Sequence, residues 1–168
     1  MYSNQEEKAQ RDYQRLLAES DFKLEMRQLL QKHAMEDWIR TLKPWEVIAH
    51  MTWPWECSMD AAMKCYERFM RKTLPDVSYF YALEANPGRR GYHVHALLSD
   101  TLGVQRKEVW RKWFEKYGRN RIEPIKSSSQ VSSYCAKYLC KEASWWNVKV
   151  LDDGLRKQTT NKTRPEAN

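Results

Sequence analysis

Two histidines separated by one residue have the types and spacing best suited to chemistry in this sequence. His93 and His95 lie in the apolar run Tyr92–Leu98, which follows two glycines and predicts a β-strand. Because side chains alternate along a strand, both imidazoles project from one face. There they can bind one metal ion together, although a pair of ordinary surface histidines has the same pattern.

The strand-like run before them supplies a candidate third ligand. Val77–Glu84 is separated from the histidine strand by a loop of hairpin length, and Pro87-Gly88 in that loop is a turn signal. In such a hairpin, Glu84 returns beside His93. The two neighbouring strands are therefore predicted to assemble a metal site from two imidazoles and one carboxylate.

A second group of reactive side chains lies further downstream. Tyr134 and Tyr138 are four residues apart, so in a helix they share one face, and Lys137 and Lys141 repeat this spacing beside them. An ordinary amphipathic helix with half-buried tyrosines and solvated lysines would have the same pattern. The pair gains interest because the predicted helix follows the last core strand and lies opposite the predicted metal face.

These residue types belong together in phosphodiester chemistry. A phenol has a pKa near 10 and is a weak nucleophile at neutral pH, but a cation that withdraws charge from a phosphate makes it effective. A neighbouring lysine can lower the pKa of the phenol or stabilise the pentavalent phosphate. Attack leaves a phosphotyrosine link that keeps the energy of the broken bond, so the strand can be rejoined, and two tyrosines would permit two successive transfers.

Composition limits the class of protein. The chain has 168 residues, enough for about one domain, and 29 basic against 22 acidic residues give a net charge of +7. This charge favours a polyanionic partner, nucleic acid before membrane, although basic proteins without such a partner are common. The sequence has no apolar run long enough for a bilayer, no signal-peptide core and no CxxC pair among its four cysteines. We expect a cytoplasmic protein of a bacterial or archaeal cell that does not bind membranes.

Three regions are expected along the chain. Residues 1–43 form an N-terminal helical extension, because leucines and aromatic residues recur at helical steps, and it is interpreted as a cover or a partner surface. Ser20 offers an N-cap that would divide this extension into two helices. Residues 44–151 form the domain that carries both motifs, and residues 152–168 form a polar, flexible tail.

The pattern of the domain is that of an α+β fold. Its strands and helices are expected in the order strand 45–53, helix 58–72, strands 77–84 and 92–98, helix 105–117, strand 121–126, helix 128–142 and strand 145–151. The central β-α-β-β-α-β unit is ferredoxin-like or RRM-like, an antiparallel sheet with helices on one face. Within the helix 105–117 we expect Val109, Trp110, Trp113 and Phe114 to point inward. The first and third core strands are neighbours, so His50 either supports the metal ligands from behind or is a plain core histidine.

The two motifs together resemble those of the HUH endonucleases, in particular the rolling-circle replication initiators (Rep proteins) of phages, plasmids and small DNA viruses. His93-Val94-His95 resembles the histidine motif, and Tyr134 to Tyr138 looks like the YxxxY form of Rep proteins with two tyrosines. Tyr138-Leu139-Cys140-Lys141-Glu142 also looks like the form with one tyrosine, which makes Tyr138 the first choice as nucleophile and Tyr134 the second. Glu84 matches the acidic residue before the histidine strand, and Thr52 is a loose match to the first motif. The resemblance covers about residues 45–151.

This resemblance implies a site-specific, single-stranded DNA endonuclease that nicks and rejoins its target. It implies Mg²⁺ or Mn²⁺ as cofactor, although the ligand types do not exclude zinc. It further implies an origin hairpin or flanking single strand as substrate, and a 5′ end held on Tyr138 or Tyr134 with help from Lys137 and Lys141. Because the sequence has no Walker A motif, a helicase would have to come from the host.

The expected DNA contacts are basic and aromatic side chains. Phosphate contacts position a strand without reading its bases, and the candidates for them are Arg89, Arg90, Arg106, Lys107, Arg111, Lys112, Arg119 and Arg121. Exposed indoles can stack on unpaired bases, and the candidates for stacking are Trp53, Trp55, Trp145 and Trp146. Core packing is an equally good interpretation of each tryptophan.

Three other functions compete with this one. An RRM-like, non-catalytic module that binds single-stranded nucleic acid would share the fold, but no RNP-type aromatic strand is evident. His50-Met51-Thr52 hints at a 2H phosphoesterase, which needs a second HxT/S motif where this chain has His93-Val94-His95. An HUH transposase or relaxase relative would perform the same chemistry.

Overall fold

A five-stranded antiparallel sheet forms the centre of the protein. The computed structural model describes residues 4–134 and 143–152. The strand order is β4-β1-β3-β2-β5. The strands are β1 Val47–Met51, β2 Ser78–Ala85, β3 Tyr92–Ser99, β4 Asn120–Pro124 and β5 Ala143–Lys149; the helices are α1 Asn4–Leu42, α2 Met59–Thr73, α3 Arg106–Tyr117 and α4 Ser128–Tyr134.

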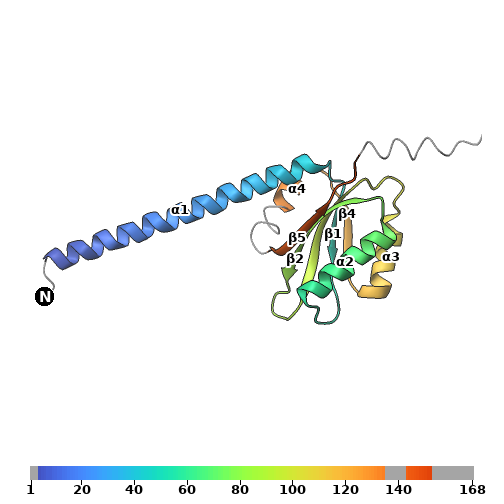
Figure 1. Cartoon of the computed structure of the whole chain (residues 1–168), viewed down its shortest axis with the longest axis horizontal. Coiled ribbons are helices and arrows are strands. Elements are labelled where there is room, and N and C mark those ends of the chain that lie inside the picture. The colour runs from blue at the N-terminus through green and yellow to red at the C-terminus, as the bar shows by residue number, and fades with distance from the viewer. Residues whose placement is uncertain (1–3, 135–142, 153–168) are drawn as a thin grey trace, which may run out of the picture.

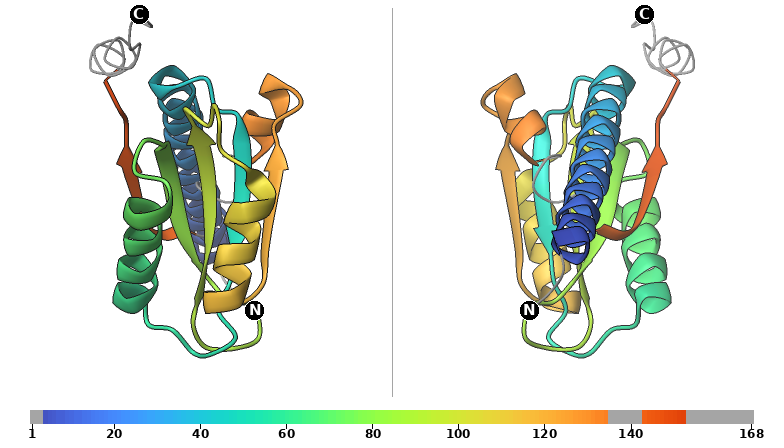
Figure 2. Two further views of the ribbon diagram at one scale, coloured as in Figure 1. Left: turned by 90° about the vertical axis from the view of Figure 1, so that its right-hand side faces the viewer. Right: turned by 90° about the vertical axis from the view of Figure 1, so that its left-hand side faces the viewer.

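The predicted α+β fold with a ferredoxin-like core is confirmed. The unit β1-α2-β2-β3-α3-β4 has the order β4-β1-β3-β2, and β5 extends the sheet beyond β2. Helices α2 and α3 pack on the same face of the sheet (Figure 2). The Ser58 side chain caps α2 by accepting the Ala61 N–H, and α3 ends at Gly118, whose φ of 112° suits glycine.

The inward face of α3 differs from the prediction. Val109, Trp113 and Tyr117 are buried at steps of four, whereas Trp110 and Phe114 are exposed and stack on each other with ring centroids 4.8 Å apart. The expectation of four inward residues included two from the adjacent stripe. The sheet accommodates one stripe of α3, and Trp110 donates its indole N–H to the Asn120 carbonyl at the edge instead.

A second apolar cluster covers the other face of the sheet. Ile39 from the end of α1 and Val131 from α4 pack there against Trp45, Phe80 and Leu97. The indole N–H of Trp45 donates to the Ile39 carbonyl at 2.8 Å, which fixes the last turn of α1 against the start of β1. The expectation of helices on one face therefore holds for α2 and α3, while α1 and α4 lie on the opposite face.

Helix α1 is continuous from Asn4 to Leu42, so the break expected at Ser20 is wrong. Most of α1 projects away from the sheet (Figure 1). Its projecting part carries exposed leucines and aromatic residues among charged ones. Among the described residues, no helix combines the length and the apolarity that a membrane span requires.

Candidate active site

The β2–β3 hairpin brings the three predicted metal ligands together. Glu84 pairs directly with His93 across the two strands, and Ala82 pairs with His95. The Asn86 N–H donates to the Gly91 carbonyl at 2.9 Å and closes the turn. Gly91 has a φ of +98°, and a Cβ on it would lie 3.0 Å from a backbone nitrogen of the neighbouring loop, so this position requires glycine. A fixed turn sets the register that the site depends on.

The coordinating atoms of this cluster converge on one point. The Nε2 atoms of His93 and His95 are 2.8 Å apart, and Oε2 of Glu84 lies 2.6 Å from Nε2 of His95 and 3.2 Å from Nε2 of His93. All three side chains are at least four-fifths buried, and they share one face of the sheet. This arrangement of one carboxylate and two imidazoles can hold a metal ion.

Asn86 orients His93, a role that the sequence analysis missed. The Asn86 side-chain oxygen lies 3.1 Å from Nδ1 of His93. An amide oxygen only accepts, so Nδ1 carries the proton and Nε2 keeps the lone pair that a metal needs. Burial, and next the charge of Arg89, lower the pKa of His93, so the imidazole is neutral at neutral pH. An asparagine before Pro87-Gly88 looks like an ordinary turn residue, which is why it was overlooked.

His50 lies directly behind the cluster. It pairs with His95 across β1 and β3, and the two ring centroids are 4.6 Å apart. On its other side His50 pairs with Arg121 of β4. Because directly opposite residues share a face, the side chains of Arg121, His50 and His95 form a row across the sheet, which Ala82 and Trp146 continue on β2 and β5.

Tyr134 lies against the same row. Its ring centroid is 5.4 Å from that of His50 and 5.8 Å from that of His95, and its hydroxyl donates to the Ala49 carbonyl at 3.3 Å. Only 6% of Tyr134 is exposed. Helix α4 thus places one of the two predicted tyrosines beside the metal ligands. The predicted nucleophile Tyr138, with Lys137 and Lys141, lies outside the described residues.

Several predicted DNA contacts lie at the hairpin end of the sheet. Arg89 and Arg90 are exposed in the hairpin loop, and Arg89 donates to the Trp53 carbonyl at 3.3 Å. Trp55 is 49% exposed in the same neighbouring loop. The backbone carbonyl of Arg119 accepts the Thr52 hydroxyl, which holds Arg119 near this end as well. These residues surround the approach to the histidine cluster.

The basic residues of α3 are not brought to this site. Arg106, Lys107 and Arg111 line a groove of about 490 Å³ beside β4, and α3 packs on the sheet face opposite the histidines. Arg111 also donates to Glu108 and Glu115, so much of its charge is balanced locally.

Among the four candidate tryptophans, the structure separates two groups. Trp53 is only 1% exposed and packs edge-on against Trp113 in the core, so its predicted stacking on bases is wrong. Trp145 pairs with Leu83 and lies on the α2 side of the sheet. Trp146, which is 44% exposed, shares the face of the histidines and stacks on Phe80. A change of one residue in register would exchange the two neighbouring tryptophans.

Comparison with protein families agrees with this site. The family model for the replication-associated protein ORF2 matches residues 50–143, which is more than half of the 168 residues. The chain belongs to this family. The resemblance to Rep proteins is thereby confirmed, and membership of a replication-associated family implies DNA as a partner. Comparison with curated proteins and with solved structures finds no match.

The matched region and the site coincide in this Rep-family protein. The match begins at His50 and includes the whole β2–β3 hairpin, Tyr134 and residues 135–142. It does not include α1 or the start of β1. Every side chain of the metal cluster therefore belongs to the part of the chain that the family shares.

Proposed function

We propose that this protein is a site-specific single-stranded DNA endonuclease and strand transferase that initiates rolling-circle replication. A tyrosine phenolate attacks a phosphodiester, the O3′ atom leaves, and the 5′ phosphate stays on the tyrosine. The observation that carries this proposal is the placing of Tyr134 beside a cluster of Glu84, His93 and His95 in a chain of the Rep family.

The donor set fits Mg²⁺ or Mn²⁺. In octahedral coordination with bonds of about 2.1 Å, neighbouring ligands lie about 3.0 Å apart. The separations of 2.6, 2.8 and 3.2 Å between the three coordinating atoms lie on both sides of that value. Glu84, His93 and His95 would hold the ion, which when bound would withdraw charge from the scissile phosphate and neutralise the leaving oxygen.

Tyr138 is the better nucleophile of the pair. The hydroxyl of Tyr134 is buried and already donates to the Ala49 carbonyl, which leaves it less able to reach a phosphate. We therefore assign the first attack to Tyr138, and to Tyr134 a wall of the site and a second transfer. Lys137 and Lys141 would lower the pKa of the phenol and stabilise the pentavalent phosphate.

A row of side chains across the sheet suits an unpaired strand. Arg121 lies at one end of the row and offers a cation to phosphate, although Glu123 pairs with it at 2.8 Å in the free protein. Trp146 lies at the other end and offers an exposed ring to a base. The strand would cross His50 and His95 between them, with Arg89, Arg90, Arg119 and Trp55 as further contacts. An origin hairpin as target and a helicase from the host complete the proposal.

Covalent capture of DNA tests this function. Single-stranded oligonucleotides that cover the cognate origin are labelled at the 3′ end and incubated with the protein and Mn²⁺. We expect a labelled adduct that survives SDS and disappears in Tyr138→Phe and in His95→Ala. The matched control is His33→Ala, an exposed histidine of α1, which should form as much adduct as the wild type.

The competing functions predict other results. A non-catalytic, RRM-like module would bind the same oligonucleotides without any adduct, and this outcome would overturn the endonuclease. A transposase or relaxase relative would form the adduct on the ends of a mobile element or on a transfer origin rather than on a replication origin.

A further inference from the structure

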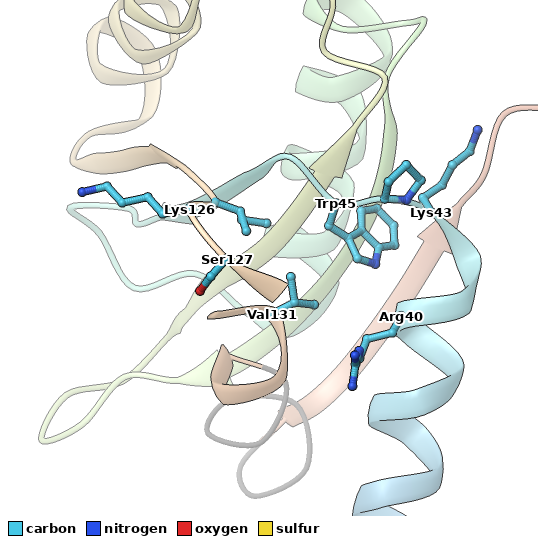
Figure 3. A pocket seen from close by; sticks show the side chains of 8 residues that line it. Arg40, Lys43, Trp45, Lys126, Ser127 and Val131 are labelled. Carbon is cyan, nitrogen blue, oxygen red and sulfur yellow. The ribbon is translucent and has the colours of Figure 1, made fainter. Parts of the chain in front are cut away.

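A groove with basic edges lies at the far end of the sheet from the hairpin loop. It forms where the end of α1, the start of β1 and the connection from β4 to α4 meet (Figure 3). Its volume is about 440 Å³. The lining residues are Arg40, Lys43, Pro44, Trp45, Ile125, Lys126, Ser127 and Val131.

The groove combines an apolar floor with cations at its edge. Arg40 and Lys126 are exposed and lie on opposite sides of Val131 (Figure 3). Among the described residues neither is paired with a carboxylate. Lys43 contributes its aliphatic part, because its ammonium group is buried and lies 3.4 Å from Asp100. The Trp45 indole N–H is likewise occupied by the Ile39 carbonyl, so the floor offers hydrophobic contact.

The position of the groove relates it to the site described above. Val131 lines the groove and Tyr134 lies beside the histidines, and these residues are one turn apart in α4, about 4.5 Å along the helix axis. Along β1, five residues separate Trp45 from His50, which at a strand rise of about 3.3 Å is roughly 16 Å. A short stretch of single strand spans this distance.

We propose that the groove binds one unpaired nucleotide of the DNA strand whose phosphodiester lies at the histidine cluster. The base would lie on Trp45, Ile125 and Val131, and Arg40 and Lys126 would hold its phosphates. This inference rests on the proposed function and adds a nucleotide subsite to it. The volume is in the range of sites for one small ligand, about 300–1,000 Å³. An apolar floor beside these two cations matches a flat ring that carries negative phosphates.

Membership of the family does not imply this subsite. Arg40, Lys43 and Trp45 precede residue 50, where the family match begins. None of the basic or aromatic residues expected from the sequence to contact DNA lines the groove. The groove therefore assigns the last turn of α1 a part in DNA binding, whereas the projecting part of α1 takes none.

Charge removal with an abasic scan tests the subsite. The double variant Arg40→Gln, Lys126→Gln is compared with the control Lys23→Gln, Arg27→Gln, which removes the same charge from the projecting part of α1. Binding is measured by fluorescence anisotropy on a set of single-stranded origin oligonucleotides, each with one abasic site at a different position. Thermal unfolding checks that both variants fold, as expected for exposed positions.

We expect one abasic position near the cleavage site to weaken binding to the wild type on the order of 5- to 100-fold, as for loss of one stacked base. In the groove variant this penalty should shrink to less than about 2-fold, and the slope of log affinity against log salt should fall by about 1.4 for two lost phosphate contacts. The control variant should keep both the penalty and the slope.

The result that overturns the subsite is a groove variant with the affinity, the abasic profile and the salt slope of the control, as expected if the groove binds an acidic peptide instead. Adduct formation on the same oligonucleotides separates this failure from that of the proposed function. If the wild type forms the adduct while the scan shows no position dependent on the groove, the subsite alone is wrong. If the scan behaves as expected without adduct, the subsite stands and the endonuclease does not.

Discussion

Asn86 offers the sharpest test of how the metal cluster works. Its amide oxygen accepts the Nδ1–H of His93 at 3.1 Å, which keeps Nε2 unprotonated and directed at Glu84 and His95. In Asn86→Ala the imidazole can rotate and can carry its proton on Nε2, where it cannot bind a metal. The backbone N–H of residue 86 still reaches the Gly91 carbonyl, so the hairpin register is kept.

The size of the effect follows from the role of the contact. Partners that orient a metal-binding histidine contribute about 10- to 100-fold to metal affinity, or about 1.4–2.7 kcal/mol. Loss of one partly exposed hydrogen bond costs only about 0.5–1.5 kcal/mol of folding stability. Asn86→Ala should therefore weaken metal binding strongly while the protein stays folded.

Calorimetric titration with Mn²⁺ measures this difference. Asn86→Asp is the matched control, because it keeps an acceptor at the same place and should bind Mn²⁺ at least as tightly as the wild type. His95→Ala should lose the site. The reasoning is refuted if Asn86→Ala binds Mn²⁺ as the wild type does while His95→Ala does not bind it.

The remaining predictions concern pH, the tyrosines and α1. Because the pKa of His93 is lowered, Mn²⁺ affinity should persist below pH 6.5 and fall when acid protonates the ring; Arg89→Gln removes a repelling charge, raises that pKa and should move the loss to higher pH, and an unchanged pH profile would contradict this cause. If Tyr138 attacks first, Tyr134→Phe should keep most adduct formation and lose about 0.5–1.5 kcal/mol of stability with its hydrogen bond, whereas the double Phe variant should form none. A chain that starts at residue 34 should melt near the full-length midpoint, whereas one that starts at residue 44 loses the buried Ile39 and should lose at least about 2–5 kcal/mol in denaturant unfolding; equal stability would place the domain boundary at 43.

The parts of the fold that depend on local pattern could be predicted from the sequence. Alternation along β3 puts His93 and His95 on one face, and the turn signal at Pro87-Gly88 sets a loop length that returns Glu84 beside His93. Two adjacent positions in the ferredoxin-like order likewise bring His50 to His95. These contacts follow from periodicity and topology alone.

The rest depends on packing that sequence pattern does not encode. Trp53, Trp145 and Trp146 are chemically alike, yet one is in the core and the other two point to opposite faces, because their burial follows from the register and from the helix that covers each face. The packing of Ile39 under Trp45 likewise joins α1 to the sheet across a segment without helix or strand. For the same reason the groove beside Val131 had no signal in the sequence.

The most direct measurement is mass spectrometry of the protein after reaction with origin DNA and Mn²⁺, followed by digestion of the DNA to short remnants. Trypsin cuts after Lys126, Lys137 and Lys141, so Tyr134 and Tyr138 fall into different peptides. We predict a deoxynucleotide phosphate on the peptide 138–141. Cleaved DNA with no nucleotide on either tyrosine peptide would contradict the covalent mechanism.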